Sequence, residues 1–134
     1  MLIDNKIISV LTIKDYKKSL DLAKCLYDSG IVNLDIRLRT QQSKKAIELI
    51  KNSKFKFNIG IGTVLSLEDL YFVKSLGIKY AYSPNTDVKI LNNANKLDIQ
   101  FIPGISNIDN VISAVKCNCK YLKYYPAEKS GGVS

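Results

Sequence analysis

A lysine stands inside an aromatic run near the end of the sequence, in CKYLKYYPAE. If this run is a strand, alternate residues share a face, and Lys123 lies on the same face as Tyr121 and Tyr125. Those rings, and arginines that point the same way from another strand, disfavour the charged form of its amine. A neutral lysine amine can condense with a carbonyl to form a Schiff base. The alternative is an edge strand on which Lys123 extends its charge into solvent, and the run alone leaves both interpretations open.

A second group of chemically active residues alternates with apolar ones in VNLDIRLR. Leu34 and Ile36 share one face, and Asp35, Arg37 and Arg39 share the other. In a parallel sheet the apolar face packs under helices, so the three charged side chains are expected to point inward. A carboxylate there can transfer protons, and a guanidinium can hold an anionic group. As structure alone, the same residues would form an internal ladder of salt bridges.

Other strand-like runs end in small polar residues or rigid turns. GIGTVL contains Gly60, Gly62 and Thr63, and two further runs end at Pro84 and Gly104. The G-x-G lacks the third glycine of a dinucleotide-binding fingerprint. We interpret its glycines as letting a substrate approach the backbone, with the hydroxyl of Thr63 beside it.

The composition limits the chemistry that these groups can perform. The 134 residues include no histidine, which excludes serine–histidine catalysis and histidine-ligated zinc. Three cysteines without framework spacing predict reduced thiols, and no metal or cofactor is expected. The net charge of +8 is spread over helical patterns among acidic residues, so neither a nucleic-acid nor a membrane partner is expected. The start of the sequence is a poor signal peptide, and we expect a cytoplasmic protein.

Six strand-like runs must position these residues. They occupy residues 6–13, 31–38, 55–61, 78–83, 99–104 and 120–126. Between them lie helical patterns at 15–29, 41–52, 66–76, about 86–96 and about 107–117. Ser66 is predicted to cap the third helix, Gly30 and Gly77 to end the first and third, and Ser106 or Asn107 to cap the fifth.

Alternating strands and helices predict βαβ units and a parallel sheet. A doubly wound sheet and a (β/α)₈ barrel are both possible, and the unbroken regularity favours the barrel. About six of eight units fit in the sequence. We therefore predict an α/β fold, an incomplete (β/α)₈ barrel, with residues 1–134 as one domain that forms about the N-terminal three quarters of the barrel.

At this point the motifs resemble a known family. LDIRLRT, GIGTVL, YSPN, IPGIS and LKYYPAE occur in the order and spacing of the 2-keto-3-deoxy-6-phosphogluconate (KDPG) aldolases and the related 4-hydroxy-2-oxoglutarate (KHG) aldolases. The resemblance covers essentially the whole chain. It implies a cytoplasmic class I aldolase, a lyase of Entner–Doudoroff carbohydrate metabolism that is usually trimeric. The implied reaction is reversible cleavage of KDPG into pyruvate and glyceraldehyde 3-phosphate.

The resemblance also implies roles for single residues. Lys123 matches the Schiff-base lysine, Asp35 the general acid/base, and Arg39 the arginine that holds the pyruvyl carboxylate. Thr63 matches a threonine that hydrogen-bonds the same part of the substrate. Pro84 and Tyr125 are the expected lining of the pocket, where a phenylalanine usually replaces the tyrosine.

The sequence departs from the family at several places. Asp35 replaces a glutamate, Arg37 replaces a small hydroxyl residue, and Asn85 replaces a glycine. The family's last two strands, whose tips bind the substrate phosphate, would follow Ser134, so we expect a fragment of a longer enzyme. The alternatives are a KHG or other 2-keto-acid aldolase, and a truncated remnant without catalysis.

Overall fold

The computed structural model describes residues 7–124, in which strands and helices alternate as the sequence predicts. The strands are β1 (Ile8–Leu11), β2 (Asn33–Arg37), β3 (Asn58–Gly62), β4 (Tyr80–Ser83), β5 (Gln100–Ile105) and β6 (Lys123–Tyr124). The helices are the 3-10 helix η1 (Tyr16–Lys18), α1 (Ser19–Asp28), α2 (Gln41–Lys51), α3 (Leu67–Ser75), α4 (Val88–Lys96) and α5 (Ile108–Lys116).

The helices begin where side chains can accept their free N–H groups. Ser66 Oγ accepts from the N–H of Asp69 (3.1 Å), and the Asp69 carboxylate accepts from the N–H of Leu65 (3.1 Å). The predicted cap of α3 is therefore confirmed. For α5 the structure selects Asn107, whose side chain accepts from the N–H of Asn110 at 2.9 Å.

Four helices end in a residue with left-handed backbone conformation. The predicted stops Gly30 (φ 85°) and Gly77 (φ 69°) follow α1 and α3. Asp98 (φ 57°) and Asn118 (φ 64°) follow α4 and α5 in the same way. Aspartate and asparagine tolerate this conformation better than other residues with a side chain, so they can replace glycine as helix ends.

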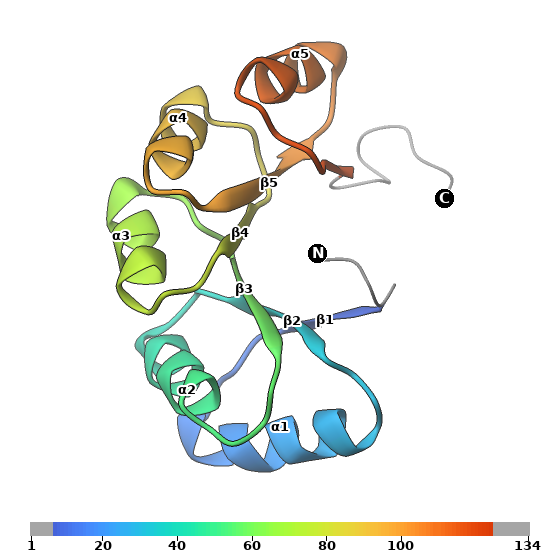
Figure 1. Ribbon diagram of the computed structural model, residues 1–134, viewed down its shortest axis with the longest axis vertical. Helices are drawn as coiled ribbons and strands as arrows, with labels where there is room; N and C mark the ends of the chain where they lie inside the picture. The colour runs from blue at the N-terminus through green and yellow to red at the C-terminus, as the bar shows by residue number, and fades with distance from the viewer. Residues whose placement is uncertain (1–6, 125–134) are drawn as a thin grey trace. The chain divides into compact units, whose positions relative to one another are not determined.

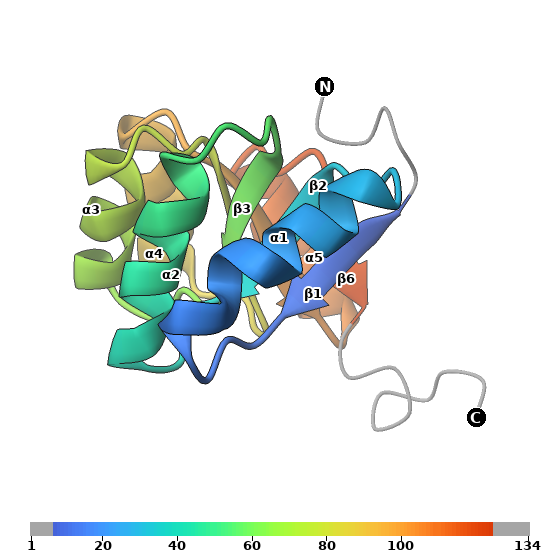
Figure 2. The same cartoon turned by 90° about the horizontal axis from the view of Figure 1, so that it is seen from below.

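Contacts within the chain group it into two compact units that divide after Gly62. In the first unit β1 pairs with β2 and β2 with β3, all parallel. Figure 1 shows α1 and α2 beside these strands, and Figure 2 shows the two helices next to each other, in agreement with their contacts. The fully buried side chains of this unit are mostly aliphatic: Leu34, Ile36, Ala46, Ile47, Ile50 and Ile61.

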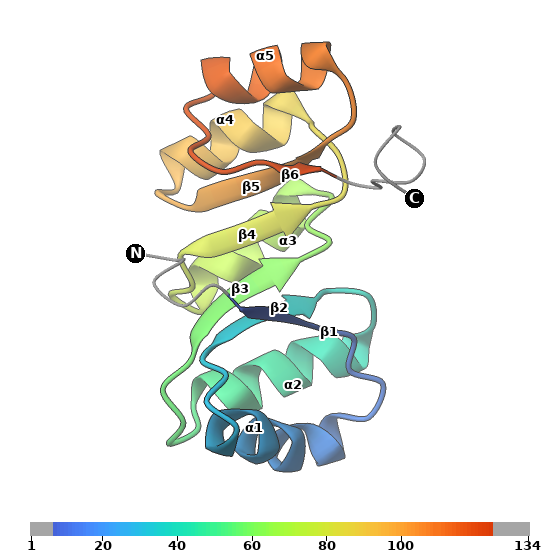
Figure 3. The same cartoon turned by 90° about the vertical axis from the view of Figure 1, so that its right-hand side faces the viewer.

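The second unit repeats the arrangement with β4, β5 and β6. Its strands pair in parallel in that order, as Figure 3 shows. Helices α3, α4 and α5 follow one another in the sequence, and α4 contacts both α3 and α5. The most buried apolar side chains include Val64, Leu70, Val73, Ala81, Leu91, Ala94 and Ala114. That the two units form one domain stays a prediction.

The last strand begins later than predicted. It was predicted for 120–126 and begins at Lys123, and residues 125 and 126 lie outside the described residues. The chain leaves α5 through a tight turn in which the N–H of Cys119 donates to the carbonyl of Ala114 (3.0 Å). The turn is followed by residues without strand pairing, so the ladder with β5 starts only at Lys123.

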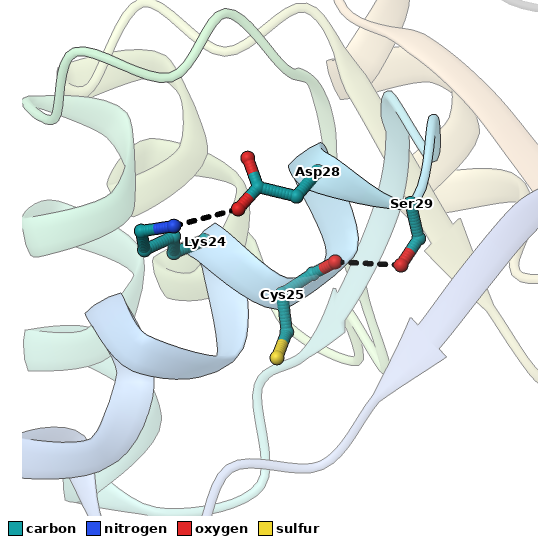
Figure 4. A network of polar contacts seen from close by, with 4 residues as sticks. All are labelled: Lys24, Cys25, Asp28 and Ser29. Atoms are coloured by element: carbon teal, nitrogen blue, oxygen red, sulfur yellow. Dashed lines mark hydrogen bonds and ion pairs between the residues drawn. The ribbon is translucent and has the colours of Figure 1, made fainter.

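The outer surface of α1 carries a small polar network (Figure 4). Lys24 Nζ and Asp28 Oδ2 are 2.6 Å apart, and Ser29 Oγ donates to the carbonyl of Cys25 at 2.8 Å. The hydrogen bond and charge of Asp28 raise the pKa of Lys24. Both side chains are exposed, so this pair contributes little to stability.

In the described part of the chain, every helix is too short or too polar to cross a membrane. Among the same residues, 7–124, cysteine, aspartate and glutamate side chains nowhere gather in a group of three that could hold a metal ion.

Candidate active site

The first unit presents the predicted carboxylate on β2. Asp35 is 2% exposed and pairs in register with Val10 of β1 and Gly60 of β3. Arg37 ends the strand and is half-buried, and Arg39 is exposed in the connection to α2. Within residues 7–62 neither guanidinium forms an ion pair or hydrogen bond, so no ladder of salt bridges involves them there.

The structure gives a different reason for a glycine at position 62 from the one that the sequence pattern suggested. A Cβ placed on Gly62 would lie 3.1 Å from Asp35 Cγ, 3.3 Å from Asp35 Oδ2 and closer still to Asp35 Oδ1. The glycine therefore makes room for a protein carboxylate. Our interpretation that it opens the backbone to a substrate does not account for this contact.

Thr63 begins the second unit in a left-handed conformation, with φ of 57°. A positive φ is unusual for any residue with a side chain and exceptional for a β-branched one. The other positive-φ residues described above follow helices, whereas Thr63 follows a strand, so helix termination does not explain it. Its neighbour Val64 is held by an N–H donation to the carbonyl of Tyr82 (3.0 Å). Backbone strain of this kind is concentrated at functional sites.

The connection after β4 packs tightly against the end of β5. A Cβ on Gly104 would lie 3.1 Å from Pro84 Cα and nearer to the carbonyl carbon and oxygen of Pro84. Thr86 Oγ1 donates to the carbonyl of Gly104 at 2.8 Å, and Ser83 Oγ donates to the carbonyl of Asn85. Sequence reasoning missed the hydrogen bond from Thr86 and the close contact of Pro84. Gly104, near the end of β5, was the sequence signal that could have indicated this close contact.

Lys123 lies beside this packed turn. It pairs in register with Gly104 across β5 and β6, so the second unit brings Pro84, Gly104 and Lys123 together. Exposure alternates as predicted: Tyr121 and Lys123 are half-buried, while Leu122 and Tyr124 are exposed. Lys123 is thus less enclosed than a buried amine among aromatic rings would be. The predicted pocket residue Tyr125 lies outside the described residues.

Among the lysines of residues 7–124, Lys123 occupies an unusual position. Lys44 and Lys123 are the two that are not exposed, and of these Lys123 is in a strand while Lys44 is in α2. A half-buried amine is restricted in its orientation and can be aimed at a bound carbonyl compound.

The opposite ends of the strands contain a cavity of about 280 Å³. It is lined by residues that include Tyr80 and Gln100, which begin β4 and β5, and Cys119. Burial, and secondarily the nearby Cys117, raise the pKa of the Cys119 thiol to about 11. Pro84 follows the end of β4, and Lys123 pairs with Gly104 near the carboxyl end of β5, so this cavity is separate from the candidate site.

Comparisons with known proteins show which family the chain resembles. A family model described as KDPG and KHG aldolase matches residues 1–134. A 2-dehydro-3-deoxy-phosphogluconate aldolase of Pseudoalteromonas atlantica is 37% identical over 95% of this chain and 59% of its own length. A KHG/KDPG aldolase of Escherichia coli is 32% identical over 95% of this chain and 60% of its own length. The solved KDPG aldolase of Legionella pneumophila matches with a TM-score of 0.88 and 32% identity, over 94% of this chain and 61% of that one.

The chain therefore spans about 60% of the length of the relatives that it matches. A second solved aldolase, from Zymomonas mobilis, matches with a TM-score of 0.87 and 27% identity over 94% of this chain. The predicted fold class, an incomplete (β/α)₈ barrel, is confirmed by these structural matches.

Proposed function

Because the chain belongs to the family of KDPG and KHG aldolases, we propose that it carries the Schiff-base part of a class I aldolase, a lyase. The proposed substrate is KDPG, which is cleaved into pyruvate and glyceraldehyde 3-phosphate. One observation above all supports Lys123 as the Schiff-base lysine. Among the lysines of residues 7–124, it is the one that lies in a strand and is not exposed. The Legionella relative holds pyruvate as a covalent carbinolamine, the adduct that an amine forms with a keto group.

In the proposed reaction the amine of Lys123 adds to the keto carbon of the substrate. The carbinolamine loses water, which leaves a positively charged iminium. A base removes the proton of the C4 hydroxyl, the C3–C4 bond breaks, and its electron pair moves toward the iminium nitrogen to give an enamine. The aldehyde departs, C3 takes up a proton, and water then releases pyruvate from Lys123. Each step balances without an external oxidant or reductant.

Charged residues of β2 and of the connection that follows it supply two further proposed roles. The Asp35 carboxylate transfers protons between water and the reacting groups. The exposed guanidinium of Arg39 holds the substrate carboxylate in a two-pronged hydrogen bond. Thr63 donates its hydroxyl to the same end of the substrate, and Pro84 and Tyr125 line the pocket.

A second candidate substrate is 4-hydroxy-2-oxoglutarate, whose cleavage gives pyruvate and glyoxylate. The Escherichia coli relative, at 32% identity, is named for both activities. Both substrates share the pyruvyl half that Lys123, Arg39 and Thr63 would bind. For the whole protein we further propose a cytoplasmic homotrimer that acts in Entner–Doudoroff metabolism, as the family resemblance implies.

Borohydride trapping tests the proposal. The chain is incubated with pyruvate, reduced, digested and examined by mass spectrometry. We expect an adduct on Lys123 that disappears in Lys123→Arg, which keeps the charge but cannot form the imine. Lys44→Arg, at the other half-buried lysine, is the matched control and should trap normally. A folded chain that traps no pyruvate, or traps it on another lysine, would contradict the proposed function.

A further inference from the structure

Gly62 and Asp35 compete for the same space at the end of β3. A Cβ added to Gly62 would lie closer than van der Waals contact to three carboxylate atoms of Asp35, and the nearest of them is Oδ1. The carboxylate thus lies over the Cα of Gly62. Since Asp35 is only 2% exposed, protein atoms also surround it on its other sides.

Conformation does not explain this glycine. Gly30 and Gly77 have φ values of 85° and 69°, with nothing within 4 Å of a built Cβ. Gly62 shows the reverse, because its φ is outside the left-handed region and its Cβ position is occupied. Alanine could adopt the backbone conformation of Gly62, so the missing side chain matters only for the room it leaves.

The backbone of Gly62 cannot easily move away to relieve such a contact. It pairs in register with Arg37, and its carbonyl accepts from the N–H of Leu38 at 2.9 Å. A side chain added at position 62 would therefore displace the flexible partner, the carboxylate of Asp35. To regain ordinary contact, the carboxylate must move by about 1 Å, an error that can cost roughly 10²-fold in rate.

We propose that Gly62 is a positioning residue for the acid/base carboxylate: by having no side chain, it determines where the carboxylate of Asp35 lies. This inference rests on the proposed function for its catalytic consequence. Its geometric part concerns only the contact between β2 and β3. Small substitutions at position 62 should then impair proton transfer while leaving the amine of Lys123 able to form its adduct.

Two readouts separate these steps in Gly62→Ala. Borohydride trapping with pyruvate reports the imine on Lys123, and exchange of the pyruvate methyl protons in D₂O reports the acid/base step. We expect the trapped yield after equilibration to equal that of the unaltered chain, and exchange to be about 10²-fold slower. Asp35→Asn should slow exchange as well, and the double variant should be no slower than Asp35→Asn alone, because both changes act through one carboxylate.

A spectroscopic readout tests the position of the carboxylate without any activity. In chain labelled with ¹³C-aspartate, Gly62→Ala should shift the Cγ resonance of Asp35. Gly30→Ala, which strains the backbone elsewhere in the same unit, should leave that resonance in place.

The two proposals can fail separately. The positioning role would be overturned if the Asp35 resonance does not move in Gly62→Ala. It would also be overturned if the exchange rate of the double variant falls by the product of the two single effects. Absence of trapping on Lys123 in the unaltered, folded chain would instead overturn the proposed function.

Discussion

Replacing Gly104 by alanine should destabilise the second unit through a contact that cannot relax. The added Cβ would overlap the carbonyl group of Pro84 and lie 3.1 Å from Pro84 Cα. These are backbone atoms, so no rotamer change can remove them. Thr86 also ties the Gly104 carbonyl to the same turn at 2.8 Å. The strand or the turn must therefore move, and Lys123, which pairs with Gly104, must move with the strand.

The magnitude follows from opposing effects. Overpacking a well-filled site costs about 1–3 kcal/mol, and contact with rigid backbone favours the upper part of that range. Alanine also stabilises the folded state by about 0.4–1 kcal/mol, because it restricts the unfolded chain more than glycine does. We therefore expect the free energy of unfolding to fall by about 2 kcal/mol, which for a chain of this size lowers Tm by roughly 8 °C.

Urea and thermal unfolding followed by circular dichroism would measure this change. Gly77→Ala is the matched control in the same unit, because Gly77 has open space around it and only a positive φ. That control should cost about 1 kcal/mol from backbone strain alone. Should Gly104→Ala prove as stable as the unaltered chain, or more stable than Gly77→Ala, the steric argument at Pro84 is wrong. Trapping of pyruvate on Lys123 should fall in Gly104→Ala and stay unchanged in Gly77→Ala.

Two further predictions concern Thr63 and the cysteines. Thr63→Gly should raise the free energy of unfolding by about 0.5–1 kcal/mol, because relief of the left-handed strain exceeds the entropic cost of glycine. Pyruvate trapping should weaken, because the hydroxyl is lost. A variant that is less stable in an unfolding measurement would refute the strain at Thr63. Burial raises the pKa of the Cys119 thiol from 9.0 to about 11, so at pH 8 it holds about 100-fold less thiolate than an ordinary thiol and is alkylated correspondingly slowly. The exposed Cys25 should be labelled first, and the rate at Cys119 should rise with pH up to about 11. Equal labelling of both in the native chain, by peptide mass spectrometry, would contradict this protection.

Features that depend on near neighbours in the sequence were predicted well. The cap of α3 at Ser66 and the stops at Gly30 and Gly77 involve groups within three or four residues of one another, so residue type and spacing suffice to identify them. Of the charged face predicted for Asp35, Arg37 and Arg39, Asp35 is buried, whereas Arg37 is half-buried and Arg39 is exposed after the strand. The resemblance of the motifs to the aldolases is confirmed by the comparisons.

Contacts between distant residues were predicted less well. Gly62 was interpreted as an opening for substrate, whereas the structure fills its side-chain position with the carboxylate of Asp35. The aromatic run left open whether Lys123 is enclosed by rings or extends from an edge strand, and the structure has it half-buried in a strand that begins three residues later than predicted. In both cases the outcome depends on which strand lies alongside and in which register, and no local pattern specifies either.

The sequence by itself determined the order of strands and helices, where the helices start and stop, and which chemical groups are available without histidine. Those properties depend on short-range hydrogen bonds, backbone preferences and residue types. Only the tertiary structure decided that Gly62 makes room for Asp35 and that Gly104 lies against Pro84 and pairs with Lys123. The physical reason is that excluded volume acts between atoms brought together by strand pairing, from parts of the chain that the sequence keeps about twenty or more residues apart.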